Sequence, residues 1–171
     1  MKGLTLNGSA VNSDDSRLQL TTGEINQAGS AFANTPVNVQ GFTTDFTFQL
    51  SGTLPLADGI TFKLQTNGPN ALGPLGGGLG YGPDHPGGTG GILNSVAVKF
   101  DVYDNQGEGL DSTGVYVNGA SPTIPSVDLT TSGVNLSSGD TISAARIRWH
   151  PLVPDTQGSS DRPRLCGPLR H

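Results

Sequence analysis

Short runs of alternating apolar and polar residues are the feature that most constrains the fold of this chain. Phe42–Leu50 places three phenylalanines on one side of such a pattern, and Gly59–Gln65 repeats it. A period of two is typical of a strand with one buried face, and no segment shows sustained helical spacing. Gly, Asn and Ser residues, which favour turns, separate the runs. The sequence therefore predicts an all-β chain.

The other expected elements are short and closely spaced. They are Leu4–Leu6, Arg17–Leu20, Val37–Val39, Val96–Phe100, Gly114–Val117, Val127–Leu129, Val134–Leu136 and Asp140–Ser143. A chain of 171 residues, 26 of them Gly, is long enough for one domain of ordinary size. Many short strands with turn signals between them indicate a sandwich or jelly roll. The alternation stops near Ala145, so we expect the folded body to span residues 1–145.

Residues 146–171 differ from this body in charge and composition. The body holds four basic and twelve acidic residues, a net charge of −8, whereas the tail holds five Arg and two Asp, a net charge of +3. Its prolines disfavour a strand. Three interpretations stay open: a basic segment that binds an anionic surface, a disordered terminus, or a segment translated in the wrong frame. We favour the third, because with suitable codons a one-base shift can spell a hairpin-like alternation between Trp149 and Leu165.

Charge and hydropathy exclude several classes of partner. The net charge of −5 makes nucleic acid a poor partner, and no apolar run is long enough to span a bilayer. Residues 1–4 begin like a signal peptide but lack an apolar core behind them. A longer secreted precursor and a cytoplasmic protein are both compatible with this start.

Oxygen-bearing side chains crowd together where one predicted strand ends. Asp101, Tyr103 and Asn105 follow the alternating run Val96–Phe100. Closely spaced oxygen ligands of this kind can hold a hard cation such as calcium, although a solvated acidic loop is the simpler alternative. Two further loops are of the kind that such a site would need beside it: Ala57–Gly59 and Leu75–Gly82.

These segments, taken in order, resemble the legume-type (L-type) lectin domain in a bacterial version, with its concanavalin-like jelly roll of two antiparallel sheets. The resemblance covers roughly residues 3–143 and implies a sandwich that is incomplete at its C-terminus. The segments that carry it are Leu4–Ala10, Phe42–Leu50, Ala57–Gln65, Leu72–Gly82, Val96–Gly119 and Val127–Thr141.

The resemblance implies a set of sugar-binding residues. In the legume members an Asp, joined to the preceding Ala by a cis peptide bond, accepts hydrogen bonds from sugar hydroxyls, and Asp58 matches it. A backbone N–H of Gly77 or Gly78 and the side-chain amide of Asn105 would complete the polar contacts. The aromatic ring that packs on the sugar would be Tyr103, with Tyr81 as the alternative.

The resemblance also implies a calcium site and the loss of a second metal site. The calcium ligands would be Asp101, the main-chain oxygen of Tyr103, Asn105, and either Glu108 or Asp111. The transition-metal site of the family has a Glu where this chain has Lys99, and a His near Ser112. Because an ammonium cannot ligate a metal, we expect no manganese site. Either calcium alone remains, or Lys99 fills part of the vacant position with its own charge.

The resemblance implies carbohydrate binding without catalysis, in a module of a secreted or cell-surface bacterial protein with glycans as its partners. Two alternatives remain. One is a glycoside hydrolase of the same fold, which would need two carboxylates across the scissile bond. The corresponding strand offers Asp101 but has Lys99 in place of a second acid. The other alternative is a structural adhesin module without sugar affinity.

Overall fold

The computed structural model describes the backbone of residues 2–14 and 16–149, and the side chains of these residues up to 144. The described chain is built from strands and one short 3-10 turn, η1 (Gly76–Gly78). The strands are β1 (Leu4–Gly8), β2 (Val11–Asn12), β3 (Leu18–Gln19), β4 (Gly29–Ala33), β5 (Phe42–Phe48), β6 (Gly59–Gln65), β7 (Ser95–Asp101), β8 (Ser112–Val117), β9 (Val127–Asp128) and β10 (Ile142–Trp149). The all-β prediction is confirmed.

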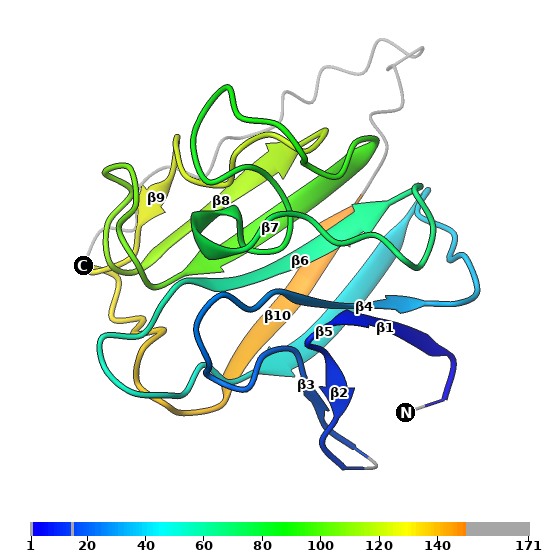
Figure 1. The fold of residues 1–171 in the computed structure, drawn as a ribbon, viewed down its shortest axis with the longest axis horizontal. Helices are drawn as coiled ribbons and strands as arrows, with labels where there is room; N and C mark the ends of the chain where they lie inside the picture. Colours follow the sequence, from blue (N-terminus) through cyan, green and yellow to red (C-terminus); the bar gives the residue numbers. More distant parts are fainter. Residues whose placement is uncertain (1, 15, 150–171) are drawn as a thin grey trace, which may run out of the picture.

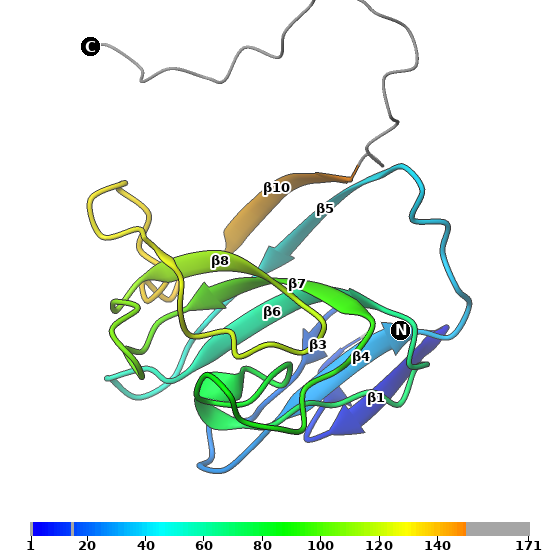
Figure 2. The same cartoon turned by 90° about the horizontal axis from the view of Figure 1, so that it is seen from above.

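The central sheet has the order β6-β7-β8-β9, and all its neighbours are antiparallel (Figure 1). Three antiparallel pairs, β5–β10, β1–β4 and β2–β3, accompany it. Seen from above, the β5–β10 pair lies on one side of the central sheet and η1 lies on the other (Figure 2). This layering matches the expected sandwich.

Aromatic residues join the central sheet to the β5–β10 pair. The Phe46 ring stacks on Phe62 with centroids 5.2 Å apart, and the Phe48 ring lies 4.8 Å from Phe100. Phe46 and Phe48 point the same way because they are two residues apart in β5. Phe46, Phe48, Phe62 and Phe100, all predicted for the core, therefore pack together, whereas Phe42, predicted with them, is not part of this cluster. Leu136 is buried in the same cluster.

A second, smaller core lies on the opposite face of the central sheet. Ala97 and Tyr116 face each other across β7 and β8, and they pack against Tyr81 and Ile92 of the long loop between β6 and β7. The Tyr81 hydroxyl accepts hydrogen bonds from Ser95 Oγ and from the N–H of Gly119. This core fixes the glycine-rich loop against the sheet.

Several boundaries differ from those expected. Val37–Val39 and Val134–Leu136 lie outside the strands, whereas Gly29–Ala33 forms a strand that the alternation did not indicate. The boundary expected at residue 145 falls inside β10, since backbone pairing with β5 extends the strand to Trp149. The rest of the expected tail, residues 150–171, lies outside the described residues. No helix among the described residues is long and apolar enough to cross a membrane.

The outer part of the central sheet keeps an apolar surface. Val115 lies opposite Val98, which in turn pairs with Phe62, so these side chains share the face that β5–β10 covers. Val115, Val117 and Val127 nevertheless remain 68%, 60% and 59% exposed. The β5–β10 pair thus covers the β6 side of this face and leaves the β8–β9 side open.

Lys63 of β6 makes stability depend on pH. Its ammonium donates to Gly80 O at 2.6 Å and lies 5.7 Å from the centre of the Phe32 ring, and burial lowers its pKa to about 8. Above this value the unfolded chain binds more protons than the folded one, so stability should rise with pH from 8 toward the ordinary lysine pKa of 10.5.

We expect the Lys63→Met variant to lose this rise, which has a maximum slope of about 1.4 kcal/mol per pH unit. Denaturant unfolding between about pH 8 and 9.5 would measure this slope. Burial raises the pKa of Tyr116 to about 12, so this residue affects stability only at higher pH. Lys2→Met, at an exposed lysine, is the matched control and should keep the wild-type slope. Equal slopes in wild type and Lys63→Met would contradict the prediction.

Candidate functional site

Three loops meet at the end of β6 and β7. Gly59 pairs with Asp101 in the sheet, so Asp58, one residue before Gly59, lies beside the segment that follows Asp101. The N–H of Val102 donates to Asp58 O at 2.9 Å and extends this pairing. A Cβ on Gly59 would lie 2.4 Å from Phe100 O, so this close pairing requires glycine.

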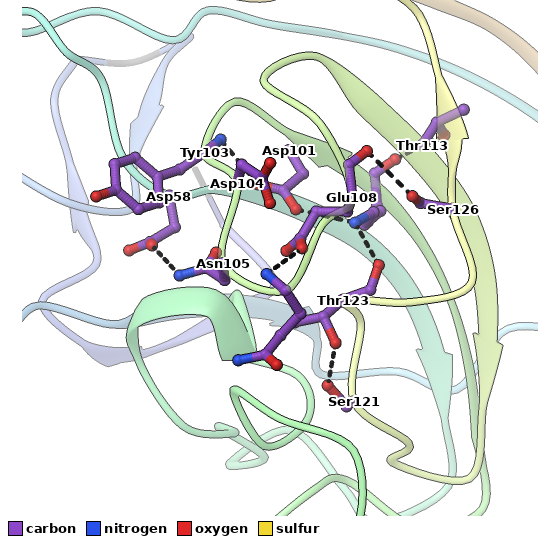
Figure 3. A network of polar contacts seen from close by, with 12 residues as sticks. Asp58, Asp101, Tyr103, Asp104, Asn105, Glu108, Thr113, Ser121, Thr123 and Ser126 are labelled. Carbon is purple, nitrogen blue, oxygen red and sulfur yellow. Dashed lines mark hydrogen bonds and ion pairs between the residues drawn. The ribbon is translucent and has the colours of Figure 1, made fainter.

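The Asp58 carboxylate faces the Asn105 amide. Asn105 Nδ2 lies 3.5 Å from Asp58 Oδ1, and Figure 3 shows the two side chains pointing toward each other. The peptide bond between Ala57 and Asp58 is cis, as the resemblance implied. Burial raises the pKa of the Asp58 carboxyl, and the hydrogen bond from Asn105 opposes this effect. The side chain is half-buried, so one side of it stays open to solvent.

The glycine-rich loop supplies the third side of the site. A Cβ on Gly77 would lie 2.7 Å from Asn105 Cγ, so the backbone of Gly77 lies directly against the amide. Gly78 instead faces Pro74, at 3.2 Å from an added Cβ. The loop is held by Thr61, whose hydroxyl donates to Leu79 O at 3.2 Å. Of the two expected glycines, Gly77 is thus the one in contact with Asn105.

The two candidate aromatic residues have different environments. Tyr81 is fully buried, and its hydroxyl donates to Tyr116 O at 3.3 Å. The expectation that Tyr81 could pack on a sugar is therefore wrong, because its ring belongs to the core behind the loop. Tyr103 is 39% exposed. It is the candidate that a ligand could reach.

A second group of polar atoms lies behind Asn105. Asp101 and Glu108 are buried, at 0% and 2% exposure, and the Asp101 Oδ1 atom accepts the N–H of Tyr103 at 3.2 Å. Burial raises the pKa of Asp101, and the charge of Glu108 raises it further, against the effect of Lys99. The Glu108 Oε2 atom accepts the N–H of Gln106. Figure 3 shows Asp101, Tyr103 and Glu108 close to one another.

Two oxygen atoms of this group are buried without a hydrogen bond. They are Asn105 Oδ1 and Glu108 Oε1, neither of which accepts a hydrogen bond from any described residue. Buried polar atoms are nearly always paired, so an orphaned amide oxygen and an orphaned carboxylate oxygen in the segment that follows Asp101 fit the oxygen ligand set of calcium. Three acidic, His or Cys side chains do not gather around one point anywhere in the described part of the chain. Amide and main-chain oxygens would therefore have to complete the coordination.

Glu108 and Asp111, the two candidates for the last calcium ligand, differ in their hydrogen bonds. Asp111 is turned away: its Oδ1 accepts the N–H of Leu136 at 3.1 Å, and its main-chain oxygen accepts the N–H of Leu129 at 2.7 Å. Asp111 thus organises the segment after β9. Glu108, with its free oxygen, is the better candidate.

The sequence left open whether Lys99 fills part of the vacant metal position. Its side chain is fully buried and its Nζ lies 2.9 Å from Asp101 Oδ2 and 2.9 Å from Thr123 O. The family transition-metal site would need a carboxylate here and an imidazole near Ser112, whose Oγ is buried without a described hydrogen-bond partner. The residues present do not fit such a metal.

The comparison with known families agrees with this geometry. The legume lectin domain model matches residues 1–149, which include every residue of the site and the whole of the described chain. Members of that family are generally non-catalytic. The chain belongs to the legume lectin domain family.

Proposed function

We propose that this domain binds carbohydrate without altering it, and that a calcium ion orders the binding loop. The observation that carries the proposal is the meeting of Asp58, Asn105 and Gly77 at one edge of the sheet, with Asn105 Nδ2 3.5 Å from Asp58 Oδ1. A carboxylate acceptor, an amide donor and an accessible backbone suit the vicinal hydroxyls of a sugar. The exposed Tyr103 ring would pack on its apolar face.

The Asn105 amide connects the proposed sugar site to the proposed calcium site. The amide has two ends: Nδ2 is directed to Asp58, while Oδ1 is buried and accepts no hydrogen bond from any described residue. A cation bound to Oδ1 would fix the amide so that Nδ2 keeps facing the sugar. The ligands we propose are Asp101, the main-chain oxygen of Tyr103, Asn105 and Glu108.

The strength expected of such a site bears on the setting of the domain. Few charged ligands and one exposed rim favour weak calcium binding, of the order of 10⁻⁴ to 10⁻³ M, as in extracellular modules. Weak binding of this kind is compatible with the setting that the resemblance implies, and we propose a module of a secreted or cell-surface bacterial protein that meets glycans outside the cell. Single-site sugar affinity near the millimolar range, about −4 kcal/mol, would then need several copies for firm retention.

The burial of the Asp101 and Glu108 carboxylates disfavours hydrolysis of the sugar. A glycosidase needs two carboxylates that flank the scissile bond, about 5 to 10 Å apart and open to the substrate. Asp101 and Glu108 are at most 2% exposed, and Asp101 is hydrogen-bonded to Lys99. Release of reducing sugar from a polysaccharide panel by the purified protein would revive the hydrolase alternative.

The Asp58→Asn variant should lose sugar binding. The change removes the charge and keeps the shape, and hydrogen bonds to a charged group contribute about 1.5 to 3 kcal/mol, which corresponds to a ten- to hundredfold weaker affinity. A glycan array followed by NMR titration with the best sugar would measure it. Asp140→Asn, at an exposed acid, is the control. Unchanged binding by Asp58→Asn would remove the proposed site.

A methyl group at Gly77 should disturb the site more than the fold. In Gly77→Ala the new Cβ would be 2.7 Å from Asn105 Cγ and would push the amide away from Asp58. We expect sugar affinity at least about tenfold weaker, with a melting temperature close to that of the wild type. Gly41→Ala, where nothing lies within 4 Å of an added Cβ, should bind normally. Full sugar binding by Gly77→Ala would show that the glycine-rich loop is not part of the binding site.

Calcium affinity should distinguish the two acids. Glu108→Gln removes the charge next to the orphaned oxygen, and calorimetry should show calcium binding at least about tenfold weaker. Asp111→Asn retains an acceptor for the Leu136 N–H and should leave the calcium affinity nearly unchanged. The reverse result would transfer the ligand role to Asp111. Calcium that raises the melting temperature without any glycan signal would favour a structural module instead.

A further inference from the structure

Lys99 occupies a position in which a charged side chain is rarely found. It lies in the middle of the sheet face, is 0% exposed, and has the Asp101 carboxylate as its ionic partner at 2.9 Å. Burying an ammonium is strongly unfavourable unless it is paired and hydrogen-bonded. The contacts of the ammonium therefore have to offset the cost of burying its charge.

The ammonium joins two segments that are distant in sequence. One contact is to Asp101 of β7, and the other is to the main-chain oxygen of Thr123 at 2.9 Å. The Tyr116 hydroxyl donates to the same oxygen at 3.0 Å and to Pro125 O at 2.6 Å, and the Tyr116 ring centre lies 5.8 Å from Lys99 Nζ. Lys99 therefore connects the calcium-ligand strand to the loop that precedes β9.

The Tyr116 ring can cover this position because Gly114 has no side chain. A Cβ on Gly114, the residue opposite Lys99 in β8, would lie 2.7 Å from the Tyr116 hydroxyl oxygen. The ring, the glycine and the Thr123 oxygen thus form a closed pocket around the ammonium, in which a cation is stabilised by a carboxylate, a carbonyl and an aromatic face. These are the contacts that a small cation would seek at the same point.

We propose that the Lys99 ammonium is a built-in cation that takes the structural place of a second metal ion. It neutralises Asp101, fixes the direction of its carboxylate, and holds the 121–125 segment, so the domain needs no transition metal and at most one bound ion. The assignment of that ion as calcium rests on the proposed function, whereas the role of Lys99 does not.

The electrostatics of the pocket give the proposal a measurable consequence. Asp101 and Glu108 are both buried, and two buried carboxylates repel each other when no cation is near. Lys99→Met keeps an unbranched side chain of similar length and removes its charge, so in this variant a bound divalent ion is the cation left to compensate the two carboxylates. Folding of this variant should therefore depend on calcium far more than folding of the wild type.

The experiment uses the full chain after treatment with a chelator. Wild type, Lys99→Met and Lys63→Met are melted in chelator and in excess calcium, and calcium-saturated wild type is titrated with manganese by calorimetry. Lys63→Met is the matched control, because it removes another partly buried ammonium, on β6, that contacts a carbonyl and an aromatic ring and has no carboxylate partner among the described residues. We expect calcium to raise the melting temperature of Lys99→Met by at least about 5 °C more than it raises that of wild type or Lys63→Met. No heat is expected from manganese.

The outcomes separate this proposal from the function proposed above. A second ion bound by the calcium-saturated wild type, or equal calcium shifts in all three proteins, would overturn the role of Lys99. A wild type that binds no calcium would refute the calcium site alone, and manganese titration of that protein would still test the built-in cation. If Lys99→Met does not fold in either condition, the manganese titration of wild type decides.

Discussion

The pairing of β6 with β7 is the constraint from which the rest of the site follows. Because Gly59 lies opposite Asp101, the chain enters β6 at the point where it leaves β7, and Asp58 and Asn105 are brought to the same edge. A shift of this register by one residue would turn Asp101 and Lys99 to the Phe100 side of the sheet and end both the ion pair and the contact with Thr123. The site is therefore a consequence of sheet register more than of loop sequence.

The register itself is readable from the sequence, and this explains which predictions hold. Phe46, Phe48 and Phe62 alternate with polar residues, and only one register buries all of them between the layers. The strands from β5 to β8 were accordingly foreseen within one or two residues, and Asp58 and Asn105 were foreseen as neighbours. β4 was missed because Gly29–Ala33 has small residues in place of a clear apolar alternation, and its pairing partner is far away in the sequence.

What the sequence could not settle depends on how loops pack in three dimensions. Tyr81 stands in a glycine-rich run that looks exposed, yet its ring is covered by Ile92 and Tyr116 from other segments. The choice between Glu108 and Asp111 is decided by Leu136, 25 residues further along the chain, whose N–H donates to the Asp111 carboxylate. The choice between Gly77 and Gly78 depends on which glycine lies against Asn105. None of these contacts leaves a local pattern in the chain, since each joins positions that are unrelated by strand or helix period.

The burial of Lys99 has a consequence for how the domain would respond to its surroundings. A metal ion is shared with every chelator and every competing protein in solution, whereas an ammonium on a side chain is present once per molecule and cannot be removed. Depletion of calcium would then loosen only the outer turn around Asn105 and leave the β7 scaffold with Asp101 intact. Sugar capture could in this way be switched off and restored by an ion while the framework that holds the ligands never has to be rebuilt.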